Sequence, residues 1–202
     1  DRERMVALLD GVEGVFCVTT FFEDGPERET EQGLTLADAA AEAGVSHFVY
    51  SSVSAADRAP LAHFTSKFAV EEHLRALDLP TTIIRPPYFM QNFEWLRGDI
   101  ETGTLQLPLS ADTVLHMVDA DDIGRAVAAA FADPDRFVGE TVDLVGDALT
   151  PTEIADVFSD VLDTQVEFVP VPLDEYRDLR GDELADMYAW FDDGAYDAEV
   201  PD

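Results

Sequence analysis

Short apolar runs alternate with helix-like segments along the first half of this 202-residue chain. The runs are VFCVTTF at 15–21, SHFVYSS at 46–52 and TTIIRP at 81–86. The segments between them, 27–44 and about 65–77, carry apolar residues at helical spacing. Strands that are apolar throughout and separated by helices form parallel sheets covered on both faces. The sequence therefore predicts an α/β protein with a doubly wound parallel sheet.

The pattern loosens in the second half of the chain. Residues 98–118 are predicted to form a hairpin-like segment with polar turns, and 119–134 a helix with an acidic start. A further helix is predicted at 150–163, where Thr150 can act as N-cap and Glu153 has capping-box spacing. We assign residues 1–97 and 119–147 to a partial Rossmann-like domain, and 98–118 and 148–202 to a smaller α+β substrate-side domain.

Dinucleotide-binding sheets begin with a strand, a glycine-rich turn and a helix. Neither G-x-G-x-x-G nor G-x-x-G-x-x-G occurs in the 202 residues, and the first predicted element is a helix at 3–10. Two interpretations follow from these residues. Either the fold does not bind nucleotides, or the chain lacks the first units of the sheet.

The net charge is strongly negative, at −31, with 43 acidic residues against 12 lysines and arginines. Such a surface repels polyanions, so we expect no direct contact with nucleic acid or with a membrane. At molar salt the Debye length is about 3 Å, and self-repulsion is screened. The acid excess and the single lysine favour a salt-loving source over an acidic protein of an ordinary cell. The absence of a long apolar stretch and the charged amino terminus predict a cytoplasmic protein.

The single lysine, Lys67, follows His63 by four residues and Ser52 by fifteen. On a helix, His63 and Lys67 face the same way, and Ser52 ends a predicted strand. Short-chain reductases use this layout, with serine polarising a carbonyl, tyrosine donating a proton and lysine binding ribose. Here His63 stands at the tyrosine position. The alternatives are a surface lysine paired with Glu71, a histidine that packs near the sheet edge, and a serine that merely ends a strand.

Five stretches together resemble the NmrA-like group of atypical short-chain dehydrogenases/reductases. They are VTTFFED (18–24), GVSHFVYSSVSA (44–55), HFTSKFAVEEHLRALDLPTTIIRPPYFMQNF (63–93), DADDIGRAVAAAF (119–131) and FVGETVDLVGDALTPTEIA (137–155). The resemblance covers essentially the whole chain and implies a Rossmann-type fold whose amino-terminal strands and glycine-rich turn are missing here. It also implies that these residues alone bind NAD(P)H poorly, and that a chain extended upstream by roughly 70 residues binds it.

The resemblance further implies NAD or NADP as cofactor and a small molecule as substrate. The strand end that borders the adenine ribose and phosphates falls on Thr19, Thr20 and Phe21, and the ribose-binding lysine on Lys67. The segment that wraps the nicotinamide falls on Tyr88, Phe89, Met90, Gln91 and Asn92. Some relatives have a basic cofactor contact where this chain has Glu31 or Gln32, which weakens any case for a 2′-phosphate preference.

Two functions remain open on this basis. The first is an NAD(P)H-dependent oxidoreductase acting on a small carbonyl or quinone-type acceptor, with proton delivery from His63, Ser52 or water. The second is a catalytically inactive regulator that senses NAD(P) and contacts a partner protein, which the missing tyrosine favours. A homodimer also remains open. We expect no metal site, because Asp119, Asp121 and Asp122 fit an acidic helix start.

Overall fold

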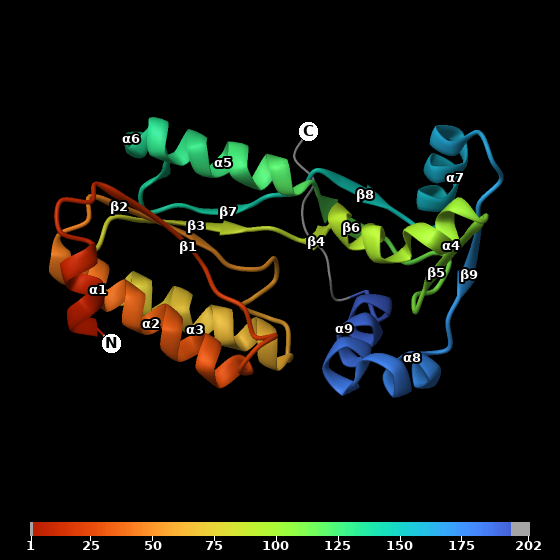
Figure 1. Ribbon diagram of the computed structural model, residues 1–202, viewed down its shortest axis with the longest axis horizontal. Helices are drawn as coiled ribbons and strands as arrows, with labels where there is room; N and C mark the ends of the chain where they lie inside the picture. Colours follow the sequence, from red (N-terminus) through yellow and green to blue (C-terminus); the bar gives the residue numbers. More distant parts are fainter. Residues whose placement is uncertain (1, 195–202) are drawn as a thin grey trace. The chain divides into compact units, whose positions relative to one another are not determined.

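The computed structural model describes residues 2–194, which form two compact units (Figure 1). Unit 1 contains residues 2–86 and 121–144, and unit 2 contains residues 87–120 and 145–194. The chain leaves unit 1 after the third apolar strand, at residue 86. It returns at residue 121 to add a helical segment and a last strand, which end by residue 144. Each unit has its own sheet structure and its own buried side chains.

A four-stranded parallel sheet forms the centre of unit 1, in the order β1-β2-β3-β7. Its strands are β1 (Gly14–Val18), β2 (His47–Ser51), β3 (Thr81–Arg85) and β7 (Thr141–Asp143). In this register Cys17 lies opposite Tyr50, and Tyr50 lies opposite Ile83. Strand β2 is buried along its whole length, as expected for a central strand covered on both faces. The predicted α/β class and parallel sheet are confirmed.

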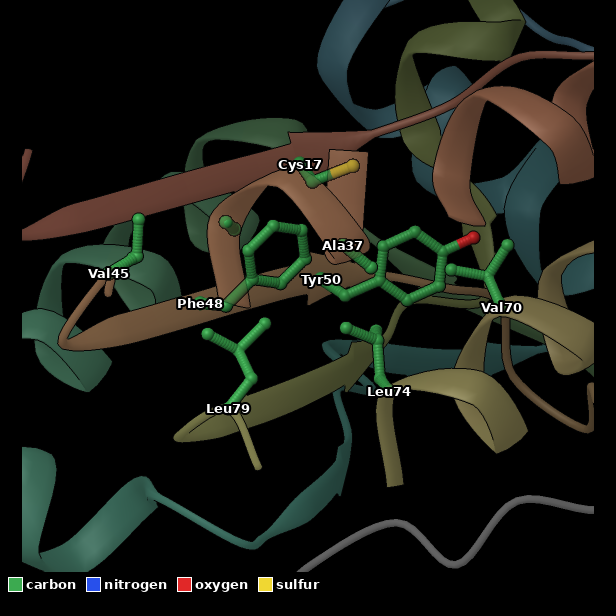
Figure 2. Packing of buried hydrophobic residues seen from close by; sticks show 9 residues of the cluster. Cys17, Ala37, Val45, Phe48, Tyr50, Val70, Leu74 and Leu79 are labelled. Atoms are coloured by element: carbon green, nitrogen blue, oxygen red, sulfur yellow. The ribbon is translucent and has the colours of Figure 1, made fainter. Parts of the chain in front are cut away.

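Helices cover both faces of this sheet (Figure 1). On one face lie α1 (Arg2–Leu8), α2 (Pro26–Ala43) and α3 (Ala62–Ala76), and on the other α5 (Ala120–Ala132) and α6 (Pro134–Phe137). The buried cluster on the first face includes Phe48, Tyr50 and Leu74 (Figure 2). Helices α2 and α3 pack closely at Gly33, where an added Cβ would lie 2.5 Å from Val70 Cγ2. A side chain larger than hydrogen at residue 33 would therefore force the two helices apart.

Unit 2 contains two small sheets. Strands β4 (Tyr88–Phe89), β6 (Leu115–Val118) and β8 (Asp147–Leu149) form one, and β5 (Thr104–Leu107) and β9 (Glu167–Pro170) form the other. Its helices are η1 (Met90–Leu96), α4 (Arg97–Glu101), α7 (Pro151–Leu162), α8 (Leu173–Arg180) and α9 (Asp182–Asp192). The predicted capping box at the start of α7 is confirmed, because Thr150 and Glu153 exchange hydrogen bonds. Within residues 2–194, every helix is too short or too polar to cross a bilayer.

The predicted hairpin over residues 98–118 is wrong. Strand β5 pairs with β9, whereas β6 pairs with β4 and β8. Polar turn residues lie between β5 and β6, but local turn signals do not determine which strands hydrogen-bond. Leu105 and Leu107 of β5 are buried, and β5 packs against α7 and β9 instead.

Candidate functional site

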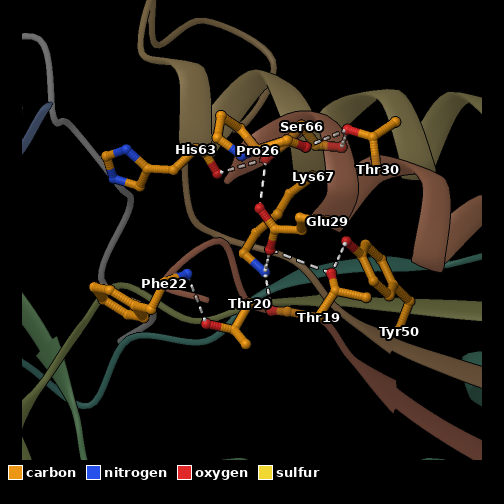
Figure 3. A network of polar contacts seen from close by, with 10 residues as sticks. All are labelled: Thr19, Thr20, Phe22, Pro26, Glu29, Thr30, Tyr50, His63, Ser66 and Lys67. Carbon is orange, nitrogen blue, oxygen red and sulfur yellow. Dashed lines mark hydrogen bonds and ion pairs between the residues drawn. The ribbon is translucent and has the colours of Figure 1, made fainter. Parts of the chain in front are cut away.

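Lys67 points from α3 to the carboxyl end of β1 (Figure 3). Its Nζ donates to the backbone oxygen of Thr19 at 2.9 Å and lies 2.8 Å from Oε1 of Glu29, a residue of α2. The lysine side chain is 13% exposed, and that of Glu29 is fully buried. The ammonium group therefore connects α3, α2 and the end of β1 in a largely water-free setting.

The carboxylate of Glu29 is surrounded by donors. Ser66 Oγ donates to its Oε2 at 2.6 Å, and Thr19 Oγ1 donates to its Oε1 at 3.2 Å. Because the Thr19 hydroxyl proton is used in this way, the Tyr50 hydroxyl at 3.4 Å acts as donor to Thr19 Oγ1. Burial raises the pKa of Tyr50, so its phenol keeps this proton. The network satisfies a charge that would otherwise be costly to bury.

The sequence alternative of a surface pair between Lys67 and Glu71 does not describe the structure. Glu71 is fully buried, and its carboxylate accepts from Arg85 Nε at 2.9 Å and Arg85 Nη2 at 2.7 Å. Arg75 adds a further contact at 2.8 Å. Sequence reasoning missed Glu29 as the partner of Lys67, since nothing local distinguishes it from the other acidic residues of this chain.

His63 packs among aromatic rings at the start of α3. Its ring stacks on Phe21 with centroids 4.8 Å apart and meets Phe64 edge-on at 4.7 Å. Phe21 in turn stacks on Phe22, whose backbone N–H donates to Thr20 Oγ1. This arrangement suits the packing role that the sequence also allowed, and proton donation by His63 stays a prediction.

Ser52 directly follows β2 at the carboxyl edge of the parallel sheet. Its backbone N–H donates to the oxygen of Ile84 at 2.8 Å, but its buried Oγ has no hydrogen-bond partner among residues 2–194. A buried hydroxyl without a partner is uncommon and marks a place where water or a ligand can bind. In open α/β sheets, ligands bind outside this edge.

The second predicted segment lies in unit 2 and consists of Tyr88, Phe89, Met90, Gln91 and Asn92. The Tyr88 hydroxyl accepts from the Tyr188 hydroxyl at 3.3 Å, and burial raises the pKa of Tyr88 to about 12. Gln91 Oε1 accepts from the backbone N–H of Ala120 at 3.0 Å, which fixes the amide side chain. The segment is thus held by contacts at both ends.

The structure therefore brings together one part of the predicted site within unit 1. Thr19, Lys67, Phe21 and His63 converge where β1 ends and α3 begins, and segment 88–92 belongs to unit 2. Within the part of the chain that the structure describes, no three or more His, Cys, Asp or Glu residues are arranged to hold a metal ion. The acidic residues at the start of α5 occupy its first turn.

Comparison with known proteins identifies the family of this chain. The model of the NmrA-like family matches residues 1–200. An NmrA-like family domain-containing protein of Dictyostelium discoideum is 27% identical over 208 residues, covering 95% of this chain and 68% of that protein. The NADP(H) complex of Citrobacter sp. triphenylmethane reductase superposes with a TM-score of 0.87 at 20% identity, over 99% of this chain and 73% of that one, and shows a shared fold. The NAD complex of NmrA, a negative transcriptional regulator, has a TM-score of 0.74 at 26% identity, over 96% of this chain and 65% of NmrA.

Proposed function

Because this chain belongs to the NmrA-like family, we propose that it binds NAD or NADP at the carboxyl edge of the unit 1 sheet. We further propose that it is an NAD(P)H-dependent oxidoreductase that acts on a small carbonyl or quinone-type acceptor. The observation that carries the proposal is Ser52, whose buried Oγ lies at this edge without a partner among the described residues. The reductase and regulator complexes reported above, which hold NADP(H) and NAD, support the choice of ligand.

The residues of unit 1 fit the ribose end of a dinucleotide. Lys67 uses two of its three N–H groups for Glu29 and Thr19, and the third is available to a ligand. A compact ammonium suits two vicinal hydroxyls better than a planar guanidinium does. Glu29 holds this ammonium in place, and Ser52 supplies a buried hydroxyl at the same edge of the sheet. When bound, a reduced nicotinamide would supply the hydride.

The residues for the other end of the cofactor fit less completely. Segment 88–92 belongs to unit 2, where Gln91 is held by Ala120, and its role toward the nicotinamide is carried by the family resemblance alone. No glycine-rich turn for the pyrophosphate occurs among the 202 residues. Proton delivery during reduction would come from Ser52, His63 or water, since Tyr50 and Tyr88 both have raised pKa values from burial.

A regulator that senses NAD(P) is the second candidate. The observation that favours it is the packing of His63 against Phe21 and Phe64 at the position where a reductase has its catalytic tyrosine. A ring held between two aromatic side chains is poorly placed to move with a substrate. In this case the protein would bind the cofactor without catalysing a reaction, and it would report the bound state by contacting a partner protein.

Titration of the protein with NADH and NADPH tests the binding proposal. We expect Ser52→Ala to weaken binding by on the order of tenfold, the loss of about one hydrogen bond, while leaving stability unchanged or higher. Ser51→Ala is the matched control, because strand alternation points Ser51 to the opposite face. Because no glycine-rich turn occurs among the 202 residues, we expect the wild-type protein to bind weakly but saturably. No saturable binding of either dinucleotide contradicts the proposal, and equal affinity in Ser52→Ala places the cofactor elsewhere.

Turnover separates the two candidates. The protein that binds NADPH is mixed with menadione or with a small aromatic aldehyde, and loss of the reduced nicotinamide is followed by absorbance. Oxidation of the cofactor in step with loss of the acceptor supports the oxidoreductase. Tight binding with no oxidation by any carbonyl or quinone supports the regulator.

A further inference from the structure

Unit 2 contains a cavity of about 470 Å³, whose lining shares one residue, Met90, with segment 88–92. Its walls come from η1, α4, β6, β8 and α7, all within unit 2. This volume lies in the range of sites that hold small molecules, and ten of its fourteen lining residues are apolar. The cavity therefore has the size and the lining of a ligand site.

One wall of the cavity is an apolar stripe on α7. Ile154 is buried, whereas Val157 and Val161 line the cavity and are 49% and 75% exposed. The spacing of three and then four residues places all three side chains on one side of the helix. A ligand in the cavity would remove this apolar surface from water, which is favourable in proportion to the area covered.

Two aromatic rings and two thioethers also line the cavity. Phe93 and Phe158 both line the cavity and meet edge to face, with centroids 5.5 Å apart. Met90 and Met117 also line it. Ring edges and thioethers make favourable contacts with a further aromatic ring. These side chains select a planar aromatic body over a flexible polar one.

The charged residues of the cavity disfavour anions. Arg97 is the one basic residue in the lining, and its guanidinium is held by Glu94 through contacts of 2.6 to 3.0 Å. Glu101 and Asp147 add two further carboxylates. A negatively charged ligand would meet three carboxylates and a cation that is already paired, so its binding would be opposed by local repulsion.

We propose that this cavity binds a small aromatic molecule that carries no negative charge. The site is formed by unit 2 alone, so binding requires neither a dinucleotide nor turnover. The proposal therefore stands or falls separately from the function proposed above.

Two fluorescent probes with nearly the same ring system test whether the cavity disfavours a negatively charged ligand. N-Phenyl-1-naphthylamine is neutral, and 1-anilinonaphthalene-8-sulfonate carries a sulfonate. We expect saturable binding of the neutral probe and at least tenfold weaker binding of the sulfonate. The comparison is made in molar KCl, where the Debye length is about 3 Å. At this salt concentration the net charge of the whole protein no longer repels the sulfonate, so a difference between the two probes reports the charges inside the cavity. Equal affinity for both probes, or no saturable binding of the neutral one, overturns the proposal.

The position of the bound probe is tested with the four methionines, Met5, Met90, Met117 and Met187. In methyl-labelled protein, ring currents of the neutral probe should shift the Met90 and Met117 signals and leave those of Met5 and Met187 unchanged. Signals are assigned by single replacement with leucine. Shifts confined to Met5 or Met187 overturn the proposed location.

A variant that fills the cavity gives an independent test. Val157→Trp should weaken binding of the neutral probe at least tenfold. Val169→Trp is the matched control, because Val169 is a similarly exposed valine of unit 2, at 42%, that does not line the cavity. Both variants are checked for folding by circular dichroism. Unchanged binding in folded Val157→Trp contradicts the proposal, and if that variant does not fold, the methionine shifts decide.

Discussion

We expect the buried pair of Lys67 and Glu29 to contribute more to the free energy of unfolding than an ion pair on the surface does. Removing one partner of a buried ion pair leaves an uncompensated charge and typically costs about 3–5 kcal/mol. Glu29 keeps its contacts to Ser66 and Thr19 when the lysine is lost, so we expect about 3 kcal/mol for Lys67→Met. Glu29→Gln keeps the shape of the side chain and removes a charge-assisted contact, which is worth roughly 2 kcal/mol.

The double variant gives the decisive measurement. If the two residues act as a pair, Glu29→Gln with Lys67→Met should cost only about 2–3 kcal/mol, well below the sum of the single changes. Urea unfolding at one fixed KCl concentration supplies all four free energies. The control cycle is Arg28→Met with Glu31→Gln, a pair on the same helix whose side chains are 55% and 65% exposed. That pair should show a coupling of less than 1 kcal/mol. Additive effects for Lys67 and Glu29, within about 0.5 kcal/mol, refute the reasoning.

Three further predictions concern unit 1. Gly33→Ala should destabilise by about 1–3 kcal/mol in urea, because its Cβ would lie 2.5 Å from Val70 Cγ2, whereas Gly98→Ala, with open space around it, should not. Burial lowers the pKa of His47 in the folded protein, so the unfolded chain is protonated first as the pH falls. The free energy of unfolding should therefore decrease as the pH drops below about 6.5, the ordinary pKa of histidine. His47→Gln should remove this part of the pH dependence. Burial also raises the pKa of Cys17 to about 11, so a thiol reagent should label it slowly in the folded protein and rapidly in urea.

The strands and helices of unit 1 could be predicted because their signals are local. Apolar runs and helical spacing are properties of neighbouring residues, and they placed β1, β2, β3 and α2 within a few residues of their true bounds. Helix α3 begins at Ala62, three residues before the predicted start, since the preceding Leu61 gives no side-chain cap that a sequence could reveal. The pairing of β5 with β9 joins segments about 60 residues apart, and no local pattern determines it.

The candidate site was predictable only in part. Lys67 was identifiable because the chain has no second lysine, and its contact with Thr19 lies where the resemblance predicted a cofactor edge. Glu29 and Glu71 could not be identified among 43 acidic residues, because what distinguishes them is burial, and burial depends on how distant segments pack. A strongly acidic composition thus conceals the few carboxylates that the fold holds inside.

The two buried carboxylates also explain why residue 67 is a lysine in a chain that otherwise uses arginine. One edge of the Arg85 guanidinium, formed by Nε and Nη2, donates to both oxygens of Glu71, and Arg75 adds a contact to one of them. At Glu29, Oε2 accepts a hydrogen bond from Ser66 Oγ at 2.6 Å, and the Lys67 ammonium contacts only Oε1, at 2.8 Å. A planar guanidinium at residue 67 would compete with Ser66 for Oε2. We therefore expect Lys67→Arg to destabilise the protein in urea unfolding, and to cost clearly less in a Ser66→Ala background. An equal cost in both backgrounds would show that the competition with Ser66 is not the reason for the lysine.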